Sequence, residues 1–125
     1  MKEIVIKKCL KCNALVSVLK DCTCDDCGIK CCGEAMNTLI PNTEDASVEK
    51  HKPILELIED KIHITVNHVM EEVHYIEWVK VITSNKEETY YFNPGDTIDI
   101  TCEYDLNIKV YAYCNLHNLW ESSLN

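Results

Sequence analysis

Apolar and polar residues alternate along three short segments in the second half of the chain. The segments are residues 62–66, 98–104 and 108–112, and the clearest is 98–104, where two Ile, Cys and Tyr alternate with Asp, Thr and Glu. A period of two predicts strands with one buried face. Residues 93–96 and 105–107 have the composition of turns.

Residues 75–83 fit two patterns. The spacing of Val73, Ile76 and Val79 fits a helix, whereas the content of Tyr, Ile, Trp and Val favours a strand. We assign a strand, because several short strands separated by turns, without a convincing long helix, are typical of an all-β domain. The expected architecture is an immunoglobulin-like antiparallel β-sandwich.

The first 36 residues differ from the rest of the chain. One short apolar strand at 14–19 is followed by a segment crowded with Cys and Asp. So short a module cannot build a stable core alone and usually depends on a metal or on disulfides. Residues 41–47 have the composition of a linker. We therefore expect a Cys-rich module at 1–36, a linker at 37–48 and a β-sandwich domain at 49–125.

Charge and hydropathy exclude two classes of partner. The 12 basic residues, all of them Lys, face 21 acidic residues, which gives a formal net charge of −9. An acidic chain without Arg is not expected to bind nucleic acid. No apolar run approaches the roughly 20 residues that span a bilayer, and residues 1–9 lack the apolar core of a secretory signal. We expect a cytoplasmic protein without a membrane partner.

Nine Cys and five His suggest metal binding. Cytosolic thiols are kept reduced, so a Cys-rich chain of this kind indicates metal sites before disulfides. Seven of the Cys lie in the first 32 residues, whereas all five His lie between His51 and His117. This segregation predicts two different metal sites in one chain.

The N-terminal site begins with Cys9 and Cys12, a Cys-x-x-Cys spacing that lets two thiolates reach one metal. Two pairs compete to complete it: Cys24 with Cys27, and the vicinal Cys31 with Cys32. Either pair gives four thiolates in a tetrahedral arrangement, which suits zinc or iron.

The second site is predicted from clustering. A single His in a strand is more often a surface or core residue than a ligand, but four His and one Cys are expected to gather at strand ends. They are His51, His68, His74, Cys114 and His117. Zinc usually takes four ligands in a closed site, so five protein ligands favour iron.

These motifs together resemble a known family. The shared motifs are Glu49-Lys50-His51, His68-x5-His74 followed by Tyr-Ile-Glu-Trp, Cys114-Asn-Leu-His-x-Leu-Trp120, and Cys-x-x-Cys followed by Cys31-Cys-Gly-Glu-x-Met36. They resemble superoxide reductases of the two-module desulfoferrodoxin type, with a desulforedoxin-like module before the catalytic domain. The resemblance spans essentially the whole chain.

The resemblance implies a ligand set for each site. The rubredoxin-like iron would be bound by Cys9, Cys12, Cys31 and Cys32. The second iron, without haem, would have equatorial His51, His68, His74 and His117 and axial Cys114. Glu49 and Lys50 match the family's residues beside the open coordination position. His63 and Cys102 match nothing in the motifs, so we expect no metal there.

The chain departs from the family pattern at three places. Val69 stands where the family usually has Pro, and Asn118 where it usually has Gly; both changes leave the ligands intact. The third departure is a set of additional thiols, namely Cys22, Cys24 and Cys27. Because of these thiols, the choice of ligands for the first metal stays open.

The resemblance also implies an activity, the one-electron reduction of superoxide to hydrogen peroxide, with iron re-reduced by an external donor such as rubredoxin. It implies a homodimer as well. An alternative hypothesis is a zinc-ribbon interaction module fused to a β-sandwich, without turnover. The two hypotheses differ in metal and in colour, because only iron with thiolate ligands would absorb visible light.

Overall fold

The computed structural model describes residues 3–24 and 28–124. Its internal contacts divide the chain into two compact units, Met1–Ile40 and Pro41–Asn125. Each unit is described by itself below. The limits expected from composition, 1–36, 37–48 and 49–125, stay predictions.

The first unit is built from short strands. Three of them, β1 (Val5–Lys8), β2 (Leu15–Val18) and β5 (Asn37–Thr38), form a sheet in the order β2-β1-β5. A separate hairpin pairs β3 (Lys30–Cys31) with β4 (Glu34–Ala35). Few of the described apolar side chains of this unit are buried: Ile6, Cys9 and Met36. A core of this size agrees with a module that depends on a metal.

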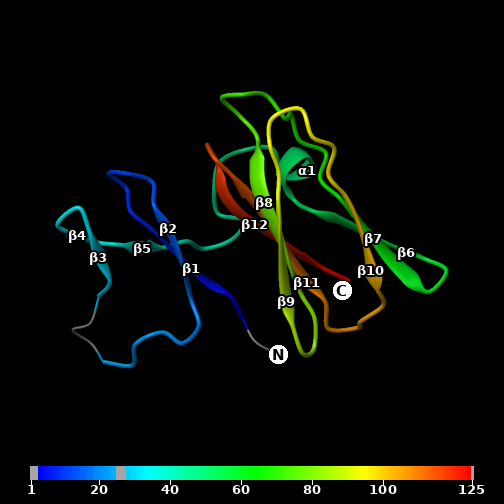
Figure 1. The fold of residues 1–125 in the computed structure, drawn as a ribbon, viewed down its shortest axis with the longest axis horizontal. Coiled ribbons are helices and arrows are strands. Elements are labelled where there is room, and N and C mark those ends of the chain that lie inside the picture. The colour runs from blue at the N-terminus through cyan, green and yellow to red at the C-terminus, as the bar shows by residue number, and fades with distance from the viewer. Residues whose placement is uncertain (1–2, 25–27, 125) are drawn as a thin grey trace. The chain divides into compact units, whose positions relative to one another are not determined.

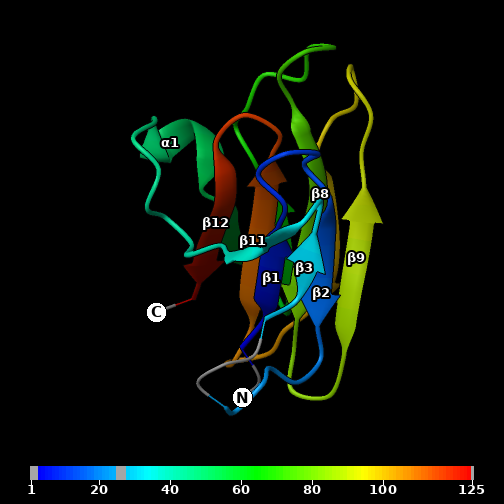
Figure 2. The same ribbon diagram turned by 90° about the vertical axis from the view of Figure 1, so that its left-hand side faces the viewer.

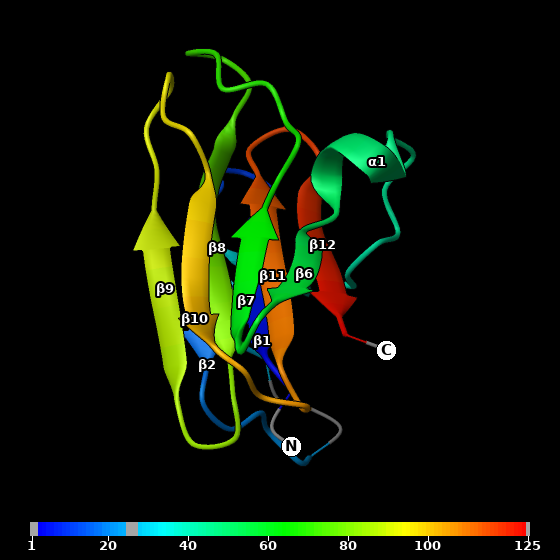
Figure 3. The ribbon, with the colours of Figure 1, turned by 90° about the vertical axis from the view of Figure 1, so that its right-hand side faces the viewer.

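The second unit is a sandwich of two antiparallel sheets (Figures 1 and 3). One sheet has the order β10-β7-β6, formed by Asp99–Glu103, Lys61–Thr65 and Ile54–Ile58. The other has the order β12-β11-β8-β9, formed by Asn118–Ser123, Lys109–Cys114, Ile76–Ile82 and Glu87–Tyr91. One helical turn, α1 (Val48–His51), precedes β6. The predicted class, a Cys-rich module followed by a β-sandwich, is confirmed.

Apolar residues from both sheets fill the space between them. The fully buried members include Ile62 and Ile64 of β7, Val79 of β8 and Val110 of β11. Cys114, at the end of β11, belongs to the same core and is 0 % exposed. The core therefore reaches the end of the sandwich at which β11 stops.

Strand β8 explains why residues 75–83 fitted two patterns. Tyr113 pairs with Trp78 but Cys114 pairs with Ile76, so the register shifts and Glu77 is an extra residue. Such a β-bulge reverses the alternation of side chains. Ile76 and Val79 both belong to the core, three positions apart, while Trp78 stacks on Tyr113 with the ring planes 9° apart.

The alternation predicted for residues 98–104 weakens towards its end. Ile98 and Ile100 are buried, Cys102 is only partly buried against the core, and Tyr104 is 48 % exposed. Tyr104 lies beyond the last residue of β10, Glu103, so its expected place on the buried face is wrong. The sheet ends before the sequence pattern does.

In the part of the chain that the structure describes, no helix has both the length and the apolar character needed to cross a bilayer.

Candidate metal centres

Four thiols of the first unit meet where two hairpin turns face each other. Cys9 and Cys12 lie in the turn between β1 and β2, which is closed by hydrogen bonds from Cys9 N–H to the Ala14 carbonyl and from Asn13 N–H to the Cys9 carbonyl, both 2.9 Å. Cys31 and Cys32 lie at the β3–β4 turn. Tight turns of this kind aim two thiols of one short segment towards one point.

The separations within this group suit a single metal ion. All four Sγ atoms lie within 4.8 Å of one another, with 3.6 Å between Cys12 and Cys31 and 3.9 Å between Cys31 and Cys32. A tetrahedral site with metal–sulfur bonds of about 2.3 Å places neighbouring sulfurs about 3.8 Å apart. The four thiols therefore have the spacing of a four-thiolate site.

The thiols share their protons unequally. A hydrogen bond from the backbone N–H of Cys12 is the main cause that lowers the pKa of Cys9 to about 7. Hydrogen bonding with the Cys12 and Cys9 thiols raises the pKa of Cys31 to about 12. Ionisation of Cys9 is thus favoured and ionisation of Cys31 is resisted. A bound cation is what allows all four thiols to ionise.

Of the additional thiols, the described Cys22 and Cys24 are not in this group. Cys24 is exposed and Cys22 takes part in a disulfide. Cys27 lies outside the described residues. Of the two pairs that the sequence left open, the structure therefore brings Cys31 and Cys32 to Cys9 and Cys12.

The second group gathers at one end of the sandwich. Its five residues come from α1, from the segment between β7 and β8, and from the end of β11 and the turn that follows it. They are His51, His68, His74, Cys114 and His117. Because β11 runs antiparallel to β8, the end of β11 and the start of β8 lie side by side.

The four imidazoles form a square. Ring centroids of neighbours are 4.6 Å apart for His51–His68, 4.6 Å for His68–His74, 5.2 Å for His74–His117 and 4.9 Å for His117–His51. His51 and His74 lie across the square at 6.2 Å. Neighbouring rings are steeply inclined, at 72° to 87°. A tetrahedral arrangement would have no such distinction between neighbours and opposite members.

The thiol lies to one side of this square. Cys114 Sγ is 3.4 Å from His68 Nε2 and 3.8 Å from His117 Nδ1, which are opposite corners. It is also within 4.8 Å of the donor atoms of His51 and His74. A sulfur this close to opposite corners must lie above or below the centre. None of these five residues supplies a donor on the other side.

Two of the imidazoles, those of His51 and His68, are held in the neutral form that binds metal. Burial lowers the pKa of His68 to about 4 and also lowers the pKa of His51. His51 Nε2 is 3.2 Å from His68 Nε2 and 3.1 Å from His117 Nδ1. The buried Nε2 of His74 has no hydrogen-bond partner among the described residues, which suits a nitrogen directed at a metal ion. The donor set therefore fits a bound metal.

Three further residues hold the imidazoles, and sequence analysis assigned them no role. Trp120 stacks on His51 at 4.8 Å between centroids and donates its indole N–H to the His117 carbonyl at 3.0 Å. Asn115 accepts the N–H of Tyr75 and donates to the Val73 carbonyl, both at 3.0 Å, which ties the segment of His74 to the turn after β11. The Ser47 carbonyl lies 2.7 Å from His51 Nδ1. Such partners orient metal-binding imidazoles.

The remaining candidates lie around or away from this group. Glu49 and Lys50 are exposed on α1, directly before His51. His63 lies in β7, with its Nδ1 3.4 Å from Thr101 Oγ1, and is not part of either cysteine or histidine group.

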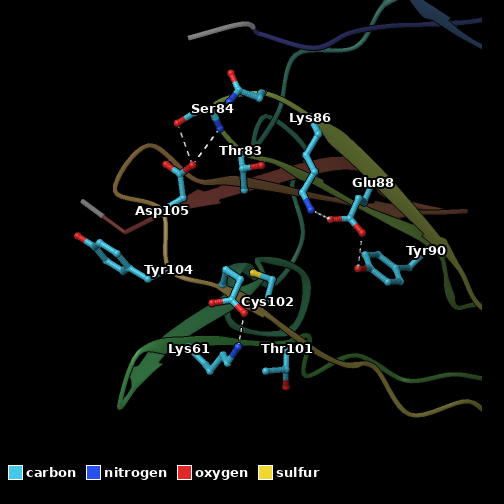
Figure 4. A pocket seen from close by; sticks show the side chains of 12 residues that line it. Lys61, Thr83, Ser84, Lys86, Glu88, Tyr90, Thr101, Cys102, Tyr104 and Asp105 are labelled. Atoms are coloured by element: carbon cyan, nitrogen blue, oxygen red, sulfur yellow. Dashed lines mark hydrogen bonds and ion pairs between the residues drawn. The ribbon is translucent and has the colours of Figure 1, made fainter.

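Cys102 lines a pocket at the opposite end of the sandwich (Figure 4). The pocket has a volume of about 530 Å³, and its charged groups pair across it, Lys61 with Glu103 and Lys86 with Glu88. Burial raises the pKa of the Cys102 thiol. Cys102 thus behaves as a small, partly buried apolar residue, as expected for a thiol that matches no motif.

The low pKa of His68 predicts a pH-dependent stability of the metal-free second unit. An unfolded His titrates near 6.5, so between about pH 6.5 and pH 4 the unfolded chain binds more protons than the folded one. The stabilisation is fully present above pH 6.5 and is lost as the pH falls through this window. We expect the urea midpoint of metal-free protein, followed by fluorescence of Trp78 and Trp120, to fall between pH 7.5 and pH 5. His68→Gln should weaken this dependence; an equal dependence in both proteins would contradict the assignment.

Comparison with known proteins agrees with this geometry. The family model for desulfoferrodoxin matches residues 43–123. A desulfoferrodoxin of Syntrophotalea carbinolica is 37 % identical over 97 % of both chains, and one of Nitratidesulfovibrio vulgaris is 33 % identical over 94 % of both. The crystal structure of the superoxide reductase from Treponema pallidum has a similar fold, with a TM-score of 0.71, 23 % identity, and coverage of 98 % of this chain and 100 % of that one. The chain belongs to the desulfoferrodoxin family.

Proposed function

We propose that this protein is a superoxide reductase. The observation that carries the proposal is the square of four imidazoles with one thiol to one side of it, found in a member of the desulfoferrodoxin family. Iron is the cofactor that the family and the two donor groups imply. In this proposal His51, His68, His74, Cys114 and His117 would hold the iron.

The donor set suits this reaction. Reduction of superoxide to hydrogen peroxide consumes one electron and two protons, and iron, when bound, would supply the electron. Four neutral imidazoles and one thiolate leave a divalent ion with a net charge of about +1, which attracts an anion. The Cys114 thiolate would donate electron density to the bound ion. Since Cys114 is 0 % exposed, the site is closed to substrate on the side of this thiol.

Lys50 and Glu49 are assigned roles beside the open position. The net charge of −9 repels superoxide at long range, but salt confines that repulsion to roughly 8–10 Å, so local charge decides the encounter. Lys50 is an exposed cation one residue before His51 and attracts the anion, helped by Lys52. Lys50 also holds water that delivers a proton. Glu49 hinders the approach of an anion and would help to expel the product.

The first unit is assigned to electron transfer. Cys9, Cys12, Cys31 and Cys32 would bind a rubredoxin-like iron there. An external donor of the rubredoxin type would return the electron spent on superoxide, and the first iron would relay it if the protein is a homodimer that brings the centres close. The spacing of the four thiols supports a metal site in the first unit, and membership of the family supports iron as the metal.

Product stoichiometry tests the function. Reduced, iron-loaded protein should form one peroxide per superoxide consumed and release no oxygen, whereas dismutation forms one peroxide and one oxygen per two superoxide.

Cys114→Ser should remove both the activity and the thiolate-to-iron charge-transfer band of the second centre. Cys102→Ser is the matched control and should change neither, because Cys102 belongs to neither metal group. Zinc in the second centre of the native protein, or oxygen release, would contradict a reductase.

Ligand choice in the first unit gives a separate prediction. Cys31→Ser should abolish the visible spectrum of the four-thiolate iron, because its Sγ lies among the other three. Cys24→Ser should leave this spectrum unchanged, because Cys24 is exposed and outside the group. Iron content and absorption of the anaerobically purified variants measure both. A spectrum that depends on Cys24 and survives Cys31→Ser would reverse the assignment.

The role of Lys50 predicts a kinetic effect. Lys50→Ala should slow the second-order reaction of the reduced protein with superoxide by about tenfold or more, through lost local attraction. Lys86→Ala removes the same charge at the opposite end of the sandwich and should change the rate by less than about twofold. Pulse radiolysis at low and moderate salt measures both variants. Equal rates for the two would remove Lys50 from the mechanism.

A further inference from the structure

Residues 41–47, here called the strap, lie against the edge strand β12. The backbone N–H of Asn42 donates to the Leu119 carbonyl at 3.0 Å. The side chain of Asn42 accepts the N–H of Glu121 at 2.9 Å and donates to the Glu121 carbonyl at 3.3 Å. One amide side chain thus exchanges both hydrogen bonds with a strand residue, as a neighbouring strand would. The strap has the composition of a linker, but it is hydrogen-bonded to the sheet.

Two further contacts fasten the strap and the residues after it. Asn118, the first residue of β12, donates its side-chain N–H to the Glu44 carboxylate. Beyond α1, Ser122 Oγ donates to the Pro53 carbonyl at 2.6 Å. The chain is therefore bonded to β12 on both sides of α1, and Figures 2 and 3 show α1 next to β12.

Helix α1 needs this support. It has four residues and no side-chain cap, and so short a helix is not stable alone. Yet it carries His51, which is 4 % exposed and lies between His68 and His117 in the square of imidazoles. The last residue of the strap reaches this ring: the Ser47 carbonyl is 2.7 Å from His51 Nδ1, and it also accepts the N–H of Lys50 at 3.3 Å.

We propose that the strap positions His51 in the metal centre and that Asn42 and Asn118 are its positioning residues. The strand holds the strap, and the strap ends at the carbonyl that faces the His51 ring. A partner on Nδ1 fixes the proton there and leaves Nε2 for the metal. The inference rests on the proposed function, in which His51 binds iron.

The backbone conformation offers clean variants. Asn42 and Asn118 have φ angles of 62° and 59°, which Gly adopts without strain. Asn42→Gly and Asn118→Gly therefore delete the side-chain hydrogen bonds while the backbone keeps its course. Glu59 has a φ of 59° in the β6–β7 turn, at the other end of the sandwich. Glu59→Gly has the same effect on backbone freedom without touching the strap.

The test compares iron-loaded proteins of full length. The double variant Asn42→Gly/Asn118→Gly should release iron from the second centre to excess chelator about tenfold or more faster than Glu59→Gly, the effect expected when partners of metal ligands are lost. The charge-transfer band that Cys114→Ser abolishes should shift in the double variant and not in the control. Asn42→Asp keeps the acceptor for the Glu121 N–H, so a variant with Asp at residue 42 should release iron more slowly than the same protein with Gly there.

Two outcomes would overturn the inference. If the parent protein loads iron in this centre, and the double variant then matches Glu59→Gly in release rate and band position, the strap is only a connection. If the parent's His and Cys group takes up no iron, the proposed function fails and this inference fails with it. A thermal midpoint equal to that of Glu59→Gly, with faster release and a shifted band, would show that the effect is on the metal centre and not on overall stability.

Discussion

The candidate metal centre of the second unit depends on bringing five donor groups to one end of a β-sandwich. Imidazoles that face one another across 3.1 and 3.2 Å gain little from each other when they are neutral, and they repel when protonated. A cation at the centre of the square turns this unfavourable arrangement into five favourable contacts. The antiparallel sheets make the gathering possible, because the end of β11 and the start of β8 lie together and the core extends to Cys114.

Most of the contacts that orient the imidazoles involve backbone groups. Trp120 bonds the His117 carbonyl, Asn115 bonds two backbone groups beside His74, and the Ser47 carbonyl faces the His51 ring. The positions of these backbone groups are fixed by the strands and turns that carry them. Hydrogen bonds to them therefore restrict the orientation of the imidazole rings. The proposed reaction would change the oxidation state of the centre, and rigid ligands would keep the geometry of the site the same in both states.

The two metal groups depend on the fold in different ways. The four thiols of the first unit come from two tight turns in a unit with a very small core, so metal binding contributes directly to its folding. The second group stands at the end of a well-packed core, so we expect the fold of the sandwich to depend less on its metal. The first unit should therefore need its metal for structure more than the second unit does.

The sequence by itself determined the residue types, because ligand chemistry depends on composition and spacing: thiols first, imidazoles later, and strands recognised from alternation. It also led to the family through short motifs that carry both donor sets. Only the tertiary structure showed that Cys31 and Cys32, and not Cys24, lie with the other two thiols. It also showed the bulge at Glu77, which explains why the sequence of β8 fitted two patterns. Finally, it showed that the segment with the composition of a linker is hydrogen-bonded to β12. Each of these depends on contacts between residues far apart in the chain, and a local pattern carries no information about which distant backbone group will be its partner.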